Sequence, residues 1–351
     1  MKTGGDRYGT HRVVEPKGVL PQPARVLNND MSEIWDNEIK LDVIRLNVDS
    51  ASFHQIKEKL KKQGHTDIEK AFAEHAIDLT TRTGKHKNED TGSGGMLIGK
   101  VIEIGTKFEM KEEIKVGDTI ASLVSLSLTP LKINKVKAVY LDKDQVEIEG
   151  QAILFSSAIY AKLPDDMDEN LALSVLDVAG APAQVQRLVK PGDNVLIMGA
   201  FGKSGVLCNA IARERAGVTG KVIGLVRKAD YAQTCIDTGC DDVIIADATD
   251  AVTIEREVSR LTKGKMADVV INCVNIEDTE MGSIVACKDR GLVYFFSMAT
   301  SFTKAALGAE GIGADIDMIL GNGYAHGHAM ISLDLLRRNP TLMKIFKERY
   351  V

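Results

Sequence analysis

The chain of 351 residues lacks any long hydrophobic run, and its apolar stretches are all far shorter than the about 20 residues that span a bilayer. Residues 1–6 have no apolar core, so no signal peptide is predicted. The basic residues are scattered without a stripe, and the net charge is -5, which disfavours nucleic acid as a partner. We therefore expect a cytoplasmic protein that binds neither membrane nor nucleic acid.

The sequence is also poor in cysteine, with five residues that all lie in the second half. An odd number of cysteines without C-x-x-C spacing is typical of reduced thiols and argues against a disulfide framework. It also provides no ligand set for a structural zinc site. His326 and His328 are spaced as a metal pair, but no third ligand is evident, so no metal is predicted.

Hydrophobic patterning changes near residue 161 and indicates two domains. Residues 1–160 combine short strand patterns (38–44, 96–104 and 115–120) with a charged amphipathic stretch at 56–76 that predicts one or two helices. Residues 161–351 alternate apolar strands with helical stretches, with strands expected at 194–199, 221–226, 242–246, 268–274, 291–297 and 317–321. A final helix is expected at 335–351, interrupted at Asn339 and Pro340. The fold class is therefore α/β, with a β-rich domain followed by a doubly wound parallel sheet.

A glycine-rich turn follows the strand at 194–199 directly and opens a helix. Its residues are Gly199, Ala200, Phe201, Gly202, Lys203, Ser204 and Gly205. Glycines in this strand–turn–helix context permit a tight turn, close approach of a diphosphate, and close packing of helix on strand. The helix N-terminus then presents free amides to the phosphates. The pattern predicts a Rossmann domain that binds NAD or NADP; the alternative is a glycine-rich turn without a ligand.

The second strand of this unit ends without the acidic residue that usually binds the ribose hydroxyls of NAD. Val226 occupies that place, and Arg227 and Lys228 follow. An arginine there suits the 2′-phosphate of NADP. Alternatively, Arg227 stacks on adenine or faces water. Later strand ends at Val274, Ser297 and Met298 are further candidates for binding the ribose and carboxamide, or are simply polar strand ends.

The order of the two domains resembles the medium-chain dehydrogenases/reductases, whose first domain is GroES-like. Segments 99–105, 116–119 and 190–196 carry this resemblance, which covers roughly residues 30–330. The zinc alcohol dehydrogenases of that superfamily place a catalytic cysteine near Asp49 and a Gly-His-Glu segment at 94–96. Neither position carries a zinc ligand in this sequence, which indicates a metal-independent member.

Four further segments, at 8–13, 16–24, 47–53 and 91–96, are similar to those of the L-erythro-3,5-diaminohexanoate dehydrogenase family. This resemblance implies oxidative deamination of that diamino acid to 5-amino-3-oxohexanoate and ammonia with a nicotinamide cofactor, in lysine fermentation. It also implies that residues 1–160 form the substrate and catalytic domain and residues 161–351 the cofactor domain. Related dehydrogenases pair through an edge strand of the Rossmann sheet, so a homodimer is expected.

The proposed chemistry needs a base, for which Asp49 is the first choice because of its place at the metal-ligand position of the related fold. Ser50 and Ser52 flank it as possible partners of the amine or carboxylate, and the alternative is an aspartate that caps a helix. His11 and His86 are other candidate bases. Lys17 or Arg12 is a candidate for holding the substrate carboxylate.

Two other functions remain open on the sequence. A zinc-independent enone or quinone reductase would need an apolar pocket, whereas an amine dehydrogenase would need acidic groups around its substrate. A nucleotide-binding protein without turnover would carry the same glycine turn.

Overall fold

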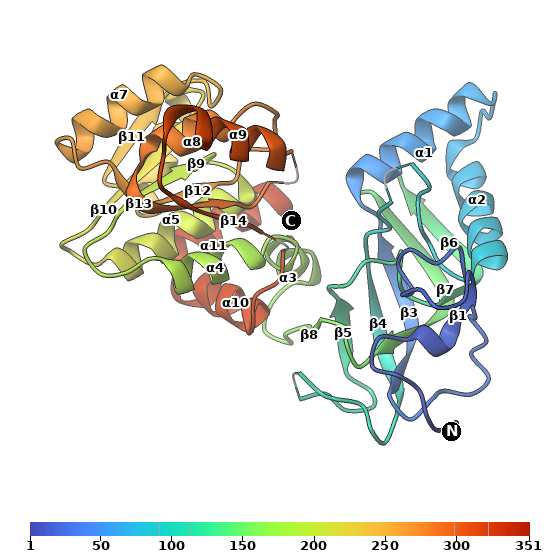
Figure 1. Cartoon of the computed structure of the whole chain (residues 1–351). Coiled ribbons are helices and arrows are strands. Elements are labelled where there is room, and N and C mark those ends of the chain that lie inside the picture. The colour runs from blue at the N-terminus through green and yellow to red at the C-terminus, as the bar shows by residue number, and fades with distance from the viewer. Residues whose placement is uncertain (91, 112, 298, 322) are drawn as a thin grey trace. The chain divides into compact units, whose positions relative to one another are not determined.

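The computed structural model describes residues 1–90, 92–111, 113–297, 299–321 and 323–351, and only the backbone of residues 50 and 51. The chain forms two compact units, Met1–Asp165 and Asp166–Val351 (Figure 1). The boundary lies where the sequence changes from irregular strand patterns to alternating strands and helices.

The first unit is built on a six-stranded antiparallel sheet with the strand order β6-β7-β3-β4-β5-β8. The strands are β3 (Glu38–Asn47), β4 (Met96–Ile104), β5 (Thr119–Ser122), β6 (Leu131–Tyr140), β7 (Gln145–Phe155) and β8 (Tyr160–Lys162). A short 3-10 helix, η1 (Thr10–Arg12), leads into a separate pair of strands, β1 (Val13–Glu15) and β2 (Val26–Leu27). The predicted β-rich first domain is therefore confirmed.

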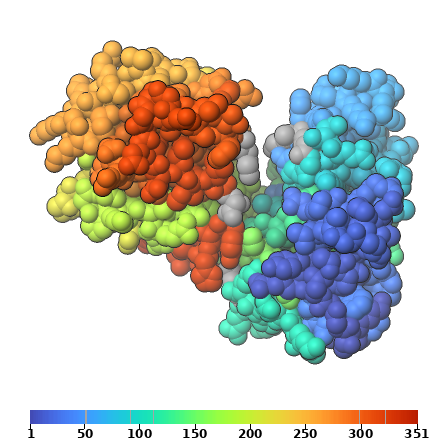
Figure 2. Space-filling model, in the orientation of Figure 1, coloured from blue at the N-terminus to red at the C-terminus, as the bar shows by residue number. Residues whose placement is uncertain are grey.

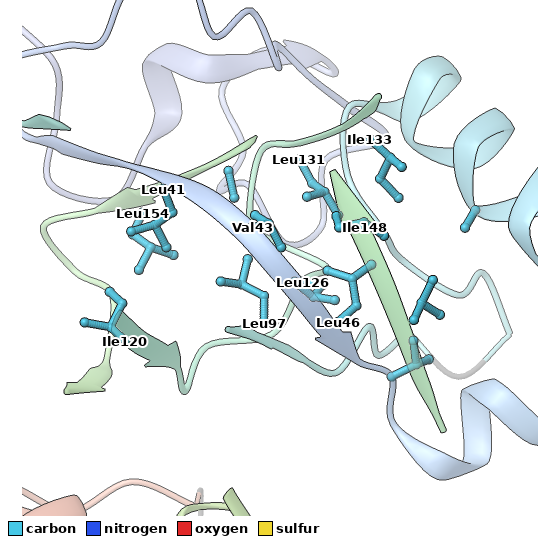
Figure 3. Close-up of a cluster of buried hydrophobic side chains, with 14 of the residues drawn as sticks. Leu41, Val43, Leu46, Leu97, Ile120, Leu126, Leu131, Ile133, Ile148 and Leu154 are labelled. Atoms are coloured by element: carbon cyan, nitrogen blue, oxygen red, sulfur yellow. The ribbon is translucent and has the colours of Figure 1, made fainter. Parts of the chain in front are cut away.

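The core of the first unit lies against the central strand β3. Leu41 and Val43 alternate with exposed residues, and Leu46 rejoins the same buried core after a register shift that follows Val43 (Figure 3). The predicted helical insert forms two helices, α1 (Ser50–Lys62) and α2 (Ile68–Thr83). The two helices pack against each other through the buried rings of Phe53 and Phe72, which stack with centroids 4.4 Å apart. Since α1 begins three residues after β3 ends, this core fixes the position of its first turn.

The second unit contains a six-stranded parallel sheet with the order β11-β10-β9-β12-β13-β14. Its strands are β9 (Asn194–Met198), β10 (Lys221–Val226), β11 (Asp242–Ile245), β12 (Ala267–Asn272), β13 (Cys287–Phe295) and β14 (Asp317–Leu320). This order is that of the doubly wound dinucleotide-binding fold, with the first strand, β9, at the point where the order reverses. The predicted Rossmann domain is confirmed.

Helices cover both faces of this sheet: α4, α5 and α10 pack together on one face, and α7, α8 and α9 on the other (Figure 1). The helical elements are α3 (Glu169–Leu176), α4 (Gly180–Leu188), α5 (Lys203–Ala216), η2 (Ala229–Tyr231), α6 (Ala232–Asp237), α7 (Ala251–Thr262), α8 (Glu280–Ala286), α9 (Phe302–Ile312), α10 (His328–Arg338) and α11 (Pro340–Tyr350). None of the helices in the described ranges is long and apolar enough to cross a bilayer.

The expected break at Asn339 and Pro340 is present, but the helix before it is longer than predicted. Asn339 ends α10 and caps α11 by accepting a hydrogen bond from the amide of Leu342, while Pro340 takes the first position of α11. Helix α10 begins seven residues before the predicted start of the final helical stretch, at His328. The predicted limit was wrong because His328, although polar, is buried and belongs to the apolar face of the helix.

Candidate active site

The glycine turn between β9 and α5 has the geometry of a diphosphate site. Gly199 has a φ of +78°, which allows the chain to turn sharply at the end of β9. A Cβ at Gly205 would collide with the carbonyl of Gly199, so only glycine lets α5 start this close to the strand. A Cβ at Gly202 would meet only the oxygen of Gly199, at 3.4 Å, and the residue is exposed. The backbone at Gly202 is thus open to a ligand.

The amides at the start of α5 are available to an anion. The first amide that bonds within the helix is that of Val206, which donates to the carbonyl of Gly202 at 3.0 Å. The amides of Lys203, Ser204 and Gly205 precede it and have no partner within the helix. Because Gly202 at the N-cap has no side chain, it does not cap them. No side chain therefore caps the partial positive charge of the helix end, and the turn fits a nicotinamide dinucleotide.

The side chain of Lys203 has a different role from the backbone of the turn. Its ammonium pairs with Asp177 at 2.8 Å and lies 5.2 Å from the centroid of Tyr350. The side chain of Lys203 is therefore directed to neighbouring helices, which leaves only its amide for the predicted cofactor contact.

Two exposed cations follow the end of β10, beside the glycine turn. Arg227 and Lys228 come after buried Val226, and the ammonium of Lys228 lies 5.8 Å from the centroid of Tyr231. Strands β9 and β10 are parallel neighbours, so their carboxyl ends, and hence the turn and these cations, share one edge of the sheet. A phosphate on the adenosine ribose would be attracted to this edge.

The ends of β12 and β13 lie on the same edge. Val274 is close to the turn, since its Cγ2 lies 3.2 Å from the position that a Cβ on Gly199 would take. Ser297 accepts a hydrogen bond from the amide of Ala299 at 3.1 Å. Met298, the remaining residue predicted here, lies outside the described residues.

A buried polar network that was not predicted supports this edge. Asn272, the last residue of β12, accepts a hydrogen bond from the amide of Val274 at 2.9 Å. Its side-chain nitrogen donates to Thr279 and Ser283, each at 2.9 Å. The signal in the sequence was an asparagine at the end of an otherwise apolar strand, and its effect is to fix the loop that carries Val274.

In the first unit, Asp49 lies just after β3 and caps α1. Its Oδ2 accepts hydrogen bonds from the amide of Ser52 at 3.2 Å and from the hydroxyl of Ser52 at 2.6 Å. This is the helix-capping arrangement that the sequence left open as an alternative. Asp49 is partly exposed, so capping still leaves the carboxylate in contact with solvent.

The prediction that Ser52 binds the substrate is corrected by the structure. Ser52 has no exposed surface, and its hydroxyl is directed to Asp49. It therefore supports the aspartate. The side chain of Ser50 lies outside the described part of the chain.

His11 and Arg12 belong to a buried ionic cluster around Glu38, which the sequence did not predict. Arg12 donates from Nε and Nη2 to the two oxygens of Glu38 at 2.8 and 2.7 Å. His11 contacts the same carboxylate through Nε2 at 2.8 Å and Asp6 through Nδ1 at 3.3 Å. Burial opposes ionisation of Glu38, but hydrogen bonds from His11 and Arg12 outweigh it, and the pKa of Glu38 is lowered.

This cluster corrects two predictions. His11 has carboxylates at both ring nitrogens, so it is not positioned as a free base. Arg12 is fully used by Glu38 and backbone carbonyls and is buried, so it does not reach a substrate carboxylate. The cluster instead ties the N-terminal segment to β3.

The remaining candidates in the first unit are also placed by the structure. His86 is completely buried, and burial lowers its pKa to about 4, which removes it as a base in contact with substrate. Lys17 is exposed, and its ammonium donates to the carbonyl of Val13 at 3.0 Å. Among the described residues, no three His, Cys, Asp or Glu side chains come together as a metal site.

Comparison with known proteins identifies one family, to which the chain is similar along its whole length. The model of the L-erythro-3,5-diaminohexanoate dehydrogenase N-terminal domain matches residues 11–164. Proteins named L-erythro-3,5-diaminohexanoate dehydrogenase from Acetoanaerobium sticklandii and Fusobacterium nucleatum are 55% and 54% identical to the chain, each over 99% of both sequences. A mycobacterial protein solved in complex with NADPH is 19% identical, with a TM-score of 0.51 over 90% of this chain and 82% of its own, and shows the shared fold. The chain therefore belongs to the L-erythro-3,5-diaminohexanoate dehydrogenase family.

Proposed function

We propose that the protein catalyses the reversible, NAD(P)-dependent oxidative deamination of L-erythro-3,5-diaminohexanoate to 5-amino-3-oxohexanoate and ammonia. The observation that carries this proposal is likeness at 54–55% identity along the entire chain to dehydrogenases of that name. It is supported by the open amides of the glycine turn, which fit the diphosphate of a nicotinamide nucleotide. We also propose that the reaction belongs to lysine fermentation, as the resemblance implies, and that the protein acts in the cytoplasm.

The bound nucleotide would supply the hydride acceptor, and the protein must supply proton transfer. The C3 amine has to be neutral before hydride leaves, because its lone pair forms the C=N bond. An alkyl ammonium has a pKa of about 10.4, so a base must remove its proton. After passing that proton to solvent, the same base can accept a proton from the water that adds to the iminium, and ammonia then leaves. No alkoxide has to be stabilised, so this route requires no metal.

Asp49 remains our proposed base. In its favour, it is a partly exposed carboxylate at the end of a buried strand, held in one orientation by both donors of Ser52. A carboxylate that also caps a helix can still accept a proton, because carboxylate oxygens each carry more than one lone pair. Ser50, next in the chain, is proposed as a partner of the substrate.

We also propose that the enzyme accepts NADP. Val226 replaces the acidic residue that would repel a 2′-phosphate, and the exposed side chains of Arg227 and Lys228 follow it at the same edge as the glycine turn. NAD would bind to the same turn without using these cations.

The direct test combines the diamine with NAD or NADP and follows both the absorbance of the reduced cofactor and the release of ammonia. Reduced cofactor and ammonia should appear in equal amounts. Reduction of simple enones without oxidation of the diamine would instead identify an enone or quinone reductase. Nucleotide binding without any turnover would indicate a binding protein.

A homodimer that pairs through the second unit is proposed as the assembly. Strand β14 is an edge strand that exposes Met318 and Leu320, with 36% and 54% of their surfaces accessible. The nearby helix α9 exposes Phe302 and Leu307, with 69% and 62% accessible, and this orange-red segment forms part of the visible face of the second unit (Figure 2). Apolar side chains on and beside an edge strand are typical of a surface that another chain covers.

A further inference from the structure

The ring of Phe201, in the middle of the glycine turn, is covered on both faces. Tyr231 stacks on it with centroids 3.9 Å apart and an interplanar angle of 10°. The guanidinium carbon of Arg349, near the end of α11, lies 3.9 Å from the same centroid. Two groups this close cannot share one face of a ring, so Phe201 is enclosed between an aromatic ring and a cation.

Arg349 also binds the backbone of the turn. Its Nη1 donates to the carbonyl of Phe201 at 3.0 Å. The amide on the other end of the same peptide unit, that of Gly202, donates to the carbonyl of Gly199 at 3.0 Å. The peptide plane between Phe201 and Gly202 is therefore fixed at both ends.

The other carbonyls of the turn are held in the same manner. The carbonyl of Ala200 accepts from the side chain of Asn209 at 2.9 Å, and that of Gly202 accepts from the amide of Val206. Four successive carbonyls, those of residues 199–202, thus have donors within the protein. Only the bond to Phe201 comes from a charged side chain outside the turn and its helix. Carbonyls that are held in this way do not face an anion at the mouth of the helix.

We propose that Arg349 is a positioning residue of the nucleotide site: it holds the peptide between Phe201 and Gly202 so that the amides beginning α5 face the diphosphate. This inference rests on the proposed use of NAD(P) and extends the site to helix α11, which the glycine motif does not include. The residue acts through Phe201, and its charge adds to the positive potential around the turn.

The ionic surroundings of Arg349 support this role. Within the described part of the chain, Arg349 forms no ion pair with a carboxylate. Arg338, at the end of α10, pairs with Glu214 at 2.7 Å on the surface. The charge of Arg349 is therefore not neutralised by a neighbouring acid, and Arg338 offers a matched control.

The test compares Arg349→Ala, Arg349→Lys and the control Arg338→Ala. Calorimetry gives the dissociation constants of NADH, NADPH and ADP-ribose, and thermal unfolding without nucleotide checks each variant's fold. We expect Arg349→Ala to weaken all three ligands by about tenfold, as loss of a hydrogen bond to a charged group does. ADP-ribose should be affected equally because it retains the diphosphate. Arg338→Ala should change affinity by less than about twofold.

The lysine variant separates position from charge and also serves if the alanine variant does not fold. Lysine keeps the charge but lacks the planar group that covers Phe201, so its affinities should recover only in part and stay closer to those of Arg349→Ala than to those of the wild type. Full recovery by lysine would overturn the positioning role, as would a variant with a lowered melting temperature but unchanged affinities. If the wild-type chain itself binds no nucleotide, the proposed function fails before this inference is reached.

Discussion

At the scale of single residues, Asp49 combines a structural bond with a proposed chemical role, and the two can be separated. Asparagine caps helices about as well as aspartate, so Asp49→Asn should keep α1 and the melting temperature while removing the base. We expect kcat for diamine oxidation to fall by at least about 100-fold, the low end for loss of general base catalysis. Nucleotide affinity should not change.

Asp49→Ala is the matching control for the cap. It should lower the free energy of unfolding by about 1 kcal/mol, because Ser52 loses its acceptor. A rate near that of the wild type in Asp49→Asn would remove Asp49 as the base.

Arg227 determines the expected preference between the two nucleotides. Arg227→Ala should lower kcat/KM with NADP by about tenfold or more, since a charge-assisted contact to the 2′-phosphate is lost, and leave NAD within about twofold. Steady-state kinetics with both cofactors measure the ratio. An unchanged ratio of kcat/KM with NADP to that with NAD would mean that the exposed guanidinium of Arg227 only faces water or stacks on adenine.

The single-residue predictions from sequence were strongest where a residue acts through its backbone. The glycines of the turn could be assigned because their spacing has a local cause. Arg12 and His11 were misjudged because their partner, Glu38, lies 26 and 27 positions away, and patterning along the chain does not reveal such a pairing. Arg349 was missed for the same reason, being 148 positions from Phe201.

At the scale of elements, the strand–turn–helix unit of β9 and α5 depends on two glycines for different reasons. In Gly205→Ala the new methyl group would collide with the carbonyl of Gly199, so the free energy of unfolding should fall by about 1–3 kcal/mol. Gly202→Ala has room for its methyl group and should keep stability, but it places that group where a diphosphate would approach.

Chemical denaturation and nucleotide titration distinguish the two effects. We expect Gly205→Ala to change mainly stability and Gly202→Ala mainly nucleotide affinity. Equal effects of both substitutions on unfolding would contradict the assignment of Gly202 to the ligand side of the turn.

Elements in the second unit followed the sequence closely because parallel strands buried on both faces are continuous apolar runs. Among the strands, the clearest deviation is β13, which starts at Cys287, four residues before the predicted limit. The charged residues Lys288, Asp289 and Arg290 hid this part of the strand. The antiparallel strands of the first unit alternate polar and apolar residues, so their limits were less well defined.

At the scale of the whole molecule, the proposed dimer has a specific requirement at β14. Leu320→Lys places a charge on the exposed edge strand and should shift the protein toward monomer, since lysine side chains on an edge strand oppose pairing with another chain. Size-exclusion chromatography with light scattering would report the mass. Val218, fully exposed at a turn far along the chain from β14, gives Val218→Lys as a control that should leave the mass unchanged. A wild-type monomer would refute the proposed assembly.

The two-domain organisation was visible in the sequence as a change from irregular strand patterns to alternating strands and helices. The structure divides the chain between Asp165 and Asp166. The substrate's identity was not accessible in this way. A β-rich domain and a nucleotide-binding turn specify a dehydrogenase, whereas choice of substrate depends on a few side chains whose positions patterning does not determine. The substrate could be proposed only from the sequence identity of the whole chain to named dehydrogenases.

The contact between Arg349 and Phe201 has a consequence for the order in which the protein matures. During synthesis the glycine turn leaves the ribosome long before helix α11, so a nascent chain holds the turn without the guanidinium that fixes its peptide plane. If Arg349 positions the turn as proposed, tight nucleotide binding waits until helix α11 has docked. Nucleotide affinity would then report whether α11 is in place.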